Sequence, residues 1–232
     1  MNTHPRQQPG QSGHSGPETL ETLEAGLEVV LGAARDRGYL GASIPIRDQI
    51  LHAAAFARAV ASPPHRAVDL GSGGGLPGLV LAAVWPESSW LLVDAQLKRT
   101  DFLSWAVDAM AYADRVVVRH GRAEDVARDP AWRGTASLVT ARSFGPPAVV
   151  AECATGFLEV HGRLVVSEPP DPDEQRWDRT LAVEGLHALG LEPVRLPPAT
   201  DATVQLRAFE QQTLTPDRYP RRAGIPAKRP LF

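Results

Sequence analysis

The sequence has few of the residues that would place it among disulfide-bonded, metal-binding or membrane proteins. Cys153 is the only cysteine among 232 residues, which excludes an intrachain disulfide and a multi-cysteine metal site. We expect its thiol to be buried rather than catalytic. No apolar stretch approaches the roughly 20 residues that a membrane-spanning helix needs, and residues 1–17 lack the apolar segment of a signal peptide. We therefore expect a cytoplasmic protein without a metal site, whose 43% of hydrophobic residues build an ordinary core.

The charge has no dominant sign overall, but it is unevenly distributed. The net charge is −3, whereas residues 216–232 hold five basic residues against Asp217 and are net +4, so the remainder is −7. The basic side chains are Arg218, Arg221, Arg222, Lys228 and Arg229. Such a run is typical of nucleic-acid contacts and also of solvated termini, and charge alone leaves both interpretations open. Prolines within it argue against a regular helix. They favour an extended arm, which could follow an RNA backbone or fold back over the ligand-binding crevice.

Hydrophobic periodicity predicts alternating helices and strands after two leading helices. Helices are expected at 18–37, 47–61, 76–85, 97–111, 146–159 and 173–189. Strands are expected at 67–70, 90–93, 115–119, 137–140, 163–166, 194–196 and 203–209. This alternation indicates an α/β fold with a mostly parallel seven-stranded sheet and helices on both faces. The last two strands have no long helix between them, which favours a hairpin with one antiparallel strand.

The predicted domain organisation is simple. We expect a disordered N-terminus at 1–17, N-terminal helices at 18–62, a ligand-binding α/β domain at 63–215 and a basic tail at 216–232. No internal repeat or linker divides the central domain.

A glycine-rich turn, "DLGSGGGLPGLVLA" at 69–82, follows the first predicted strand and leads into a helix. Such a turn lies at the carboxyl edge of a parallel sheet, where ligands bind. Glycine permits positive φ and lets a ligand approach the backbone closely. A turn without a ligand needs one or two glycines, whereas this one has five in eight positions. The pattern therefore predicts a bound ligand.

Two ligand classes compete for this turn. The pattern G-x-G-x-x-G at 73–78 matches the dinucleotide fingerprint, and Asp94 follows at about the right distance for a ribose contact. The fuller pattern, D-x-G-x-G-x-G at 69–75, resembles the first motif of class I methyltransferases that use S-adenosylmethionine (SAM). An acid near the turn suits the cationic half of SAM, and Asp94 suits its ribose hydroxyls. Taken alone, Asp94 could be a helix cap ahead of Leu97, but beside this turn the ribose role is favoured.

A nicotinamide-dependent oxidoreductase is the weaker alternative, because no hydride-transfer constellation accompanies the glycines. In the methyltransferase interpretation the cofactor-binding residues of the turn and the following strand are Asp69, Gly71, Gly73, Gly75 and Asp94.

The longer match is more specific. The stretches "DLGSGGGLPGLVLA", "LLVDAQLKRTDFL", "HGRAED" and "LVTARSF" together resemble the RsmG (GidB) family of guanine-N7 methyltransferases of small-subunit ribosomal RNA. The closing "RYPRRAGIPAKRPLF" is similar to the C-terminal tail of that family. The resemblance implies a SAM-dependent enzyme with a Rossmann-like fold, whose partner is ribosomal RNA or the small ribosomal subunit.

The resemblance also implies residue roles. It places cofactor contacts at Gly71, Leu76, Ala123 and Glu124. It places Arg142 at the end of the fourth strand, beside both cofactor and RNA, as the catalytic candidate. An ordinary strand-end arginine in a salt bridge is the structural alternative. The tail would contact RNA through Arg221, Arg222, Lys228 and Arg229.

Two departures from the family pattern affect the substrate side. The family has a lysine-glycine pair after the fifth strand, where this chain has Ser167, Glu168 and two prolines. The N-terminal His-x-x-Asp-Ser pattern is missing, and His52 is its nearest candidate. Phe144 could hold an unstacked base or simply belong to the core. A methyltransferase of another RNA or of a small molecule, and a SAM-binding protein without catalysis, therefore remain alternatives.

Overall fold

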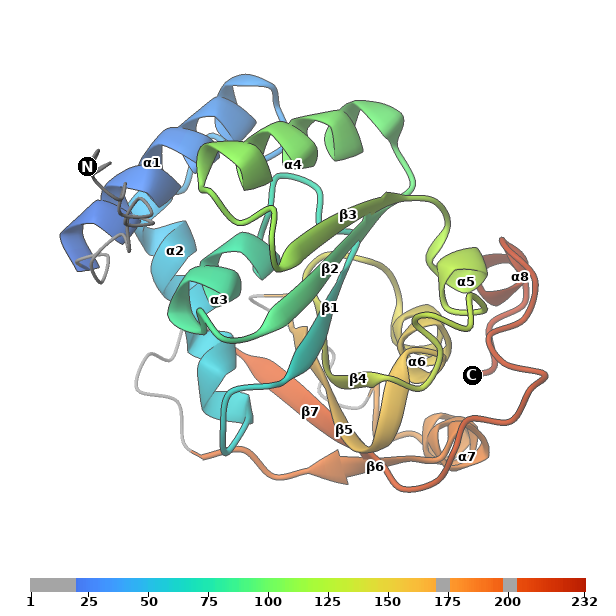
Figure 1. Ribbon diagram of the computed structural model, residues 1–232. Coiled ribbons are helices and arrows are strands. Elements are labelled where there is room, and N and C mark those ends of the chain that lie inside the picture. Colours follow the sequence, from blue (N-terminus) through green and yellow to red (C-terminus); the bar gives the residue numbers. More distant parts are fainter. Residues whose placement is uncertain (1–19, 170–175, 198–203) are drawn as a thin grey trace, which may run out of the picture.

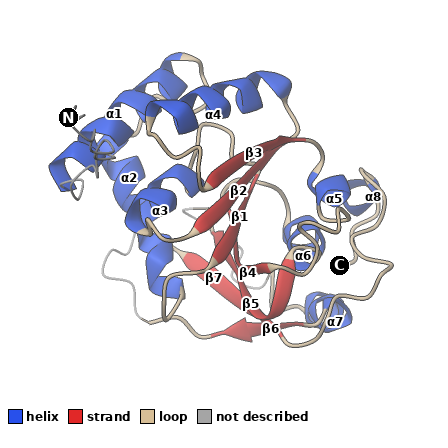
Figure 2. Ribbon diagram, in the orientation of Figure 1, coloured by secondary structure: helices blue, strands red, loops and turns tan. Residues whose placement is uncertain are grey.

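The computed structural model describes residues 20–169, 176–197 and 204–232. The predicted disordered N-terminus at 1–17 lies outside the described residues, as do the starts of the helix predicted at 173–189 and of the strand predicted at 203–209. Figure 1 shows a central twisted sheet with helices on both faces. Figure 2 shows the same view by secondary structure.

The strands form one sheet in the order β3-β2-β1-β4-β5-β7-β6. They are β1 (Arg66–Leu70), β2 (Ser89–Asp94), β3 (Val116–His120), β4 (Ala136–Ala141), β5 (Leu158–Ser167), β6 (Leu191–Val194) and β7 (Leu206–Gln211). The strands β1 to β5 pair in parallel, and β7 runs antiparallel to both β5 and β6. The predicted seven-stranded, mostly parallel sheet with one antiparallel strand is confirmed.

The helices divide between the two faces of this sheet. They are α1 (Leu20–Asp36), α2 (Ile46–Ala54), the 3-10 helix η1 (Ala55–Ala59), α3 (Gly78–Val84), α4 (Leu97–Ala109), α5 (Ala123–Val126), α6 (Pro147–Thr155), α7 (Thr180–Leu189) and α8 (Ile225–Lys228). In the described residues no helix has the length and apolar character needed to span a membrane. The helices α1 to α4 lie on one face and α5 to α7 on the other (Figure 1).

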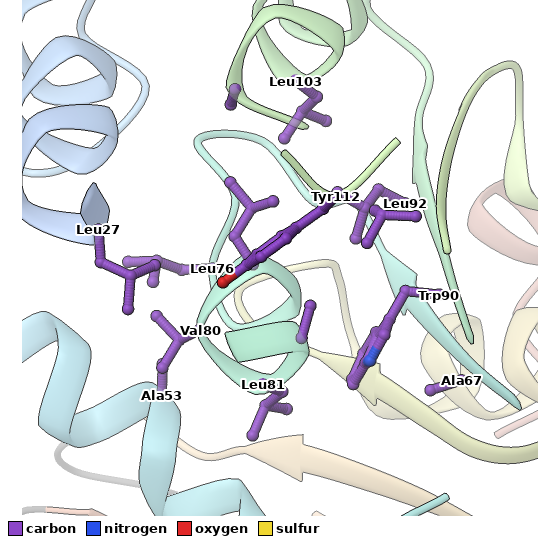
Figure 3. Close-up of a cluster of buried hydrophobic side chains, with 14 of the residues drawn as sticks. Leu27, Ala53, Ala67, Leu76, Val80, Leu81, Trp90, Leu92, Leu103 and Tyr112 are labelled. Atoms are coloured by element: carbon purple, nitrogen blue, oxygen red, sulfur yellow. The ribbon is translucent and has the colours of Figure 1, made fainter. Parts of the chain in front are cut away.

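Each face of the sheet has its own hydrophobic cluster. Figure 3 shows the first, in which Leu27 of α1 and Ala53 of α2 join side chains of α3, α4 and β2. Burial of such apolar area is the main stabilising contribution to a fold of this kind. The N-terminal helices are therefore packed on the α/β body rather than separate from it.

Several predicted boundaries are corrected by the structure. The helix predicted at 146–159 ends at Thr155, and β5 begins at Leu158 because Ala136 of β4 pairs with it. The strand predicted at 194–196 lies earlier, at Leu191–Val194. Gly190 ends α7 with φ +77°, so the chain turns directly into β6. The tail also contains one helical turn, α8, although its prolines argued against a helix; Pro226 occupies the first turn, where no N–H partner is needed.

Candidate functional site

The glycine turn between β1 and α3 has a backbone that only glycine adopts readily. Gly71, Gly73 and Gly75 have φ of +66°, +53° and +97°. A β-carbon added at Gly71 would lie 2.7 Å from Cδ2 of Phe144. The turn is therefore held open by the absence of side chains, and the Phe144 ring takes part of the space beside it.

Asp69 lies beneath this turn and ties it to the sheet. Its Oδ2 accepts a hydrogen bond from the Gly78 N–H at 3.2 Å, and its Oδ1 accepts one from Thr140 Oγ1 at 2.8 Å. Complete burial raises the pKa of Asp69 to about 7, against the opposing effects of these bonds and of the positive charge of Arg142. The carboxyl group that was predicted to face the ligand thus serves as the internal support of the turn.

Asp94 lies between the start of α4 and the glycine turn and contacts both. Its Oδ1 accepts a hydrogen bond from the Gln96 N–H at 2.8 Å at the start of α4, and its Oδ2 accepts one from the Gly73 N–H at 3.0 Å. Arg99 Nη1 lies 3.7 Å from the same Oδ2. The side chain is 4% exposed and lines the cavity beside the turn. A carboxylate has about four acceptor positions, so it retains capacity for hydroxyl donors.

A cavity of about 210 Å³ lies beside the turn. Four of the predicted cofactor residues line it, namely Gly71, Asp94, Ala123 and Glu124. The Glu124 carboxylate is engaged elsewhere, because its Oε1 accepts hydrogen bonds from Arg122 Nη2 at 3.2 Å and from the Gly224 N–H at 2.9 Å. The Glu124 side chain therefore joins the start of α5 to the C-terminal tail and in this way helps to form the cavity wall.

The other predicted cofactor residues do not line this cavity. Gly73 and Gly75 shape the turn, and the Leu76 side chain is buried in the core beside Val80 (Figure 3). For Leu76 the structure shows a packing role.

A second, larger cavity of about 1,120 Å³ opens over the ends of β4 and β5. Phe144 and Gly145 line both cavities and so lie between them. Ser143, just before Phe144, has φ +54°, an unusual backbone conformation for a serine, and turns the chain at the end of β4. Sequence reasoning left Phe144 undecided between core and substrate roles; the structure makes it a shared wall of two cavities.

Arg142 lines the larger cavity, as its strand-end position predicted. Its Nη1 is buried and has no hydrogen-bond partner among the described residues. Burial lowers the pKa of Arg142 and the Asp69 carboxyl opposes this, but a guanidinium remains charged under ordinary conditions. Within 20–169, 176–197 and 204–232, no carboxylate satisfies this donor, in contrast to the simple salt-bridge interpretation.

The C-terminal tail folds back on the protein rather than extending from it. Arg221 binds Glu152 of α6 through its guanidinium, with Nη2 at 2.6 Å from Oε2 and Nε at 2.9 Å from Oε1. Glu152 is completely buried. Further along the tail, Ala227 of α8 lines the 210 Å³ cavity. Figure 1 shows α8 beside α5, with the C-terminus on the same side of the sheet. Of the two courses predicted for the tail, along an RNA backbone or back over the crevice, the structure shows the second.

The four predicted RNA-binding residues of the tail differ in their surroundings. Arg222, Lys228 and Arg229 are exposed, whereas Arg221 is held by Glu152. Sequence reasoning missed Glu152, although a signal was present. It is the only charged residue of the apolar helix Pro147–Thr155, and an isolated buried charge requires a partner.

These features can be compared with known proteins. A family model described as "rRNA small subunit methyltransferase G" (GidB) matches residues 45–178. The chain belongs to this family. GidB relatives named ribosomal RNA small subunit methyltransferase G include one from Rubrobacter xylanophilus, 34% identical over 92% of this chain and 84% of its own. Another, from Chloroflexus aggregans, is 34% identical over 87% of this chain and 82% of its own.

Solved structures confirm the fold of this GidB protein. An O-methyltransferase from Bacillus cereus in complex with SAH aligns with a TM-score of 0.59 and 15% identity, over 80% of this chain and 90% of its own. The O-methyltransferase TomG from Streptomyces achromogenes in complex with SAM aligns with a TM-score of 0.57 and 15% identity, over 81% and 90% of the two chains. The chain has the class I methyltransferase fold.

The protein is a SAM-dependent methyltransferase, and its residues fit that cofactor. Gly71 exposes its backbone to the cavity without a side chain of its own, and the cavity-lining Asp94 carboxylate retains acceptor capacity for ribose hydroxyls. Both predictions, the family and the cofactor, are confirmed.

Proposed function

We propose that this protein methylates N7 of a guanine in small-subunit ribosomal RNA. The names of its relatives support the RNA substrate. The observation that carries the proposal is the arrangement of two cavities that share Phe144 and Gly145, one lined by the glycine turn and the other by Arg142. A methyl donor in the smaller cavity and an acceptor base in the larger one would meet where the two cavities adjoin, at the edge formed by Phe144 and Gly145.

The proposed reaction does not require the protein to remove a proton from the acceptor base. Guanine N7 carries an in-plane lone pair and no proton, so its attack needs no general base. SAM supplies, when bound, the electrophilic methyl group. The protein has to align the acceptor with the donor and exclude water, and such orientation can contribute most of the acceleration.

Arg142 is the proposed catalytic residue. A guanidinium does not act as a base, but it donates well to guanine O6 or to a phosphate. The buried Nη1 without a partner is suited to this role, because a buried donor without a hydrogen bond is unfavourable until a ligand supplies one.

The larger cavity has room for an unstacked base. Ile44 and Leu51, from the segment that contains α2, line this cavity and are 45% and 59% exposed, and Phe144 lines it from the loop after β4. RNA-modifying and RNA-binding proteins commonly hold splayed bases against aromatic and apolar side chains. These residues form the proposed base-binding surface.

We further propose Gly71, Asp94, Ala123 and Glu124 as the residues that hold SAM, with Asp69, Gly73, Gly75 and Leu76 shaping the turn from behind. Arg222, Lys228 and Arg229 are proposed to contact the RNA backbone, and Arg221 is proposed to anchor the tail that presents them. This division follows from which side chains are exposed and which are already bound.

The test is transfer of tritiated methyl groups to small ribosomal subunits from a strain lacking this gene, with the labelled nucleoside identified. We expect 7-methylguanosine in the small-subunit RNA, and transfer reduced at least about 100-fold by Arg142→Ala, the range for loss of a transition-state hydrogen-bond donor. Label in a different nucleoside, or only in another RNA or a small molecule, would overturn the proposal in favour of the alternative substrates.

A further inference from the structure

A buried carboxylate at the end of β5 is not used by the methyl-transfer roles described above. Glu168 lines the 1,120 Å³ cavity, and its side chain is 4% exposed. Its Oε1 accepts a hydrogen bond from Trp177 Nε1 at 2.7 Å, and its Oε2 lies 2.9 Å from Arg176 Nε. Trp177 is itself buried. The carboxylate is therefore held in a fixed orientation at the wall of the proposed base-binding cavity.

The order of strands at this edge places three features in a row. The strands β1, β4 and β5 are neighbours in the sheet and parallel. They lead to the glycine turn, to Arg142 and to Glu168 respectively. Parallel neighbours end at the same edge, so the methyl-donor cavity, a guanidinium and a carboxylate follow one another across it.

The functional groups of guanine follow the same order around one side of the base. N7 comes first, then the O6 acceptor, then the N1–H and the 2-amino donors. The O6 acceptor is matched by the donors of a guanidinium, and the adjacent N1–H and 2-amino donors are matched by the two oxygens of a carboxylate. We propose that Glu168 recognises the Watson–Crick edge of the target guanine by accepting hydrogen bonds from N1–H and the 2-amino group. This inference rests on the proposed function.

The carboxylate has the capacity that this role needs. Its two oxygens offer about four acceptor positions. Trp177 Nε1 donates to Oε1, and Arg176 Nη2 donates weakly to the same oxygen at 3.4 Å. Arg176 Nε lies 2.9 Å from Oε2 as an ion pair without hydrogen-bond geometry, so the acceptor positions of Oε2 remain available. The supports therefore orient Glu168 without exhausting it.

The same carboxylate would reject adenine. Adenine presents an unprotonated N1 acceptor where guanine presents N1–H, and two acceptors facing each other repel. A carboxylate also suits the product, because guanine gains a positive charge as N7 is methylated. Part of the contribution of Glu168 therefore increases in the transition state and affects kcat as well as KM.

The experiment compares guanosine with inosine, which lacks only the 2-amino group. Once the labelled position has been mapped in the assay above, small-subunit RNA carrying either base at that position is assembled into subunits and methylated by the wild-type enzyme and by Glu168→Gln. We expect wild-type kcat/KM to fall by about 10- to 100-fold on inosine, the range for loss of a hydrogen bond to a charged group. Glu168→Gln should reduce transfer to guanosine by a similar factor and should lose much of the preference between the two bases.

Trp177→Phe is the matched control. It removes one support of the carboxylate but keeps the carboxylate itself, so transfer to both bases should fall while the guanosine-to-inosine ratio stays near its wild-type value. Circular dichroism and affinity for S-adenosylhomocysteine show whether each variant is folded.

Three results would overturn the inference. A wild-type ratio near one would show that the 2-amino group is not recognised, and this measurement needs no variant. A wild-type ratio retained in Glu168→Gln would show that Glu168 only supports Trp177 and Arg176. Loss of the ratio in Trp177→Phe as strongly as in Glu168→Gln would assign the discrimination to the packing around Trp177. Failure of the proposed function is distinguishable from all three, because the wild-type enzyme would then label no guanine in the small subunit.

Discussion

The cavities on the two sides of Phe144 are built in different ways. The smaller one, of about 210 Å³, is lined by the glycine turn, the end of β2, the start of α5, the segment after β4 and α8, and several of these residues are glycine or alanine. The backbone of its turn is held by Asp69 and Asp94 through hydrogen bonds to main-chain N–H groups. The larger one, of about 1,120 Å³, is lined by side chains from α2, from the ends of β4 and β5, and from the segments around 176 and 204. Main-chain geometry thus dominates the proposed donor side, and side-chain identity dominates the proposed acceptor side.

This difference has a consequence for what substitutions do. On the donor side a change should alter cofactor affinity by distorting the backbone, with no effect on which base is recognised. On the acceptor side a change should alter the reaction or the choice of base while cofactor affinity is preserved. The following predictions test this division, beginning with the largest expected effect.

The largest effect is expected at the glycine turn. Gly71→Val combines a positive φ with a β-carbon that would overlap the Phe144 ring, so SAM binding measured by calorimetry should fall by more than about 100-fold. Circular dichroism should still show a folded protein. Gly32→Val is the matched control, because a β-carbon at Gly32 of α1 meets no atom within 4 Å. Normal SAM binding by Gly71→Val would mean that the turn only packs.

A pH dependence of stability is expected from the buried support of the turn. Burial raises the pKa of Asp69 to about 7 from its ordinary value of 3.8, so the folded protein holds this proton more tightly than the unfolded chain. The contribution of the protonated Asp69 side chain to the free energy of unfolding is fully present below about pH 4 and is lost as the pH rises to about 7. One pKa unit corresponds to about 1.4 kcal/mol, which allows a loss of up to about 4 kcal/mol.

Urea unfolding of wild type and of Asp69→Asn between pH 4 and pH 8 measures this contribution. The asparagine keeps an oxygen acceptor but has no titrating proton, so the difference in unfolding free energy between the two proteins should move in favour of Asp69→Asn as the pH rises. A difference that is constant over this range would show that Asp69 does not titrate there.

The two adjacent tail arginines should behave oppositely. Arg221→Gln leaves the buried Glu152 carboxylate without its partner and should lower the free energy of unfolding by about 3 kcal/mol. Because Ala227 of the same tail lines the donor cavity, SAM affinity should fall as well. Arg222→Gln, at an exposed site, should leave both quantities within about 0.5 kcal/mol. Equal stability of the two variants would contradict the anchoring role of Arg221.

A smaller effect is expected for the carboxylate of β2. Asp94→Ala should weaken SAM binding by about 1.5–3 kcal/mol, the range for hydrogen bonds to a charged group. Asp94→Asn keeps one acceptor oxygen and should lose less. Calorimetry with SAM and with NAD checks both the loss and the expected lack of NAD binding. An unchanged affinity in Asp94→Ala would remove Asp94 from the cofactor site.

The smallest effect per residue is expected on the exposed tail. We expect weaker RNA binding when Arg222, Lys228 and Arg229 are neutralised together. The salt dependence, measured as the slope of log K against log salt, should become shallower by about 2, because each phosphate contact to single-stranded RNA contributes roughly 0.7. SAM affinity should not change, because these side chains are exposed. Filter binding across a salt series measures the slope, and an unchanged slope would make the tail charges a solubilising feature only.

Much of the donor side could be predicted from local sequence. The glycines at 71, 73 and 75 were expected at a turn that needs positive φ, and all three have it. Asp94 was expected as either a cap or a ligand contact; its Oδ1 accepts a hydrogen bond from the Gln96 N–H just before α4, and the residue lines the cavity. The role of Asp69 was not predicted correctly, because its burial depends on Thr140 of β4, 71 residues away.

The acceptor side and the tail depended on contacts between distant segments. Nothing near Arg221 in the sequence indicates Glu152, and nothing near Glu168 indicates that Trp177 orients it. A pattern of basic residues reports charge but not which charges are already neutralised, so the sequence left open whether the tail follows an RNA or folds back.

By itself, therefore, the sequence determined the alternation of strands and helices, the glycine turn and the family, because periodicity and backbone conformation depend on neighbouring residues. The tertiary structure alone decided which carboxylates support the turn, that Phe144 lies between two cavities, and that Arg221 anchors a folded tail. The physical reason is that burial and ion pairing are set by partners brought together across the sheet, and one side chain acquires a different role according to which partner is there.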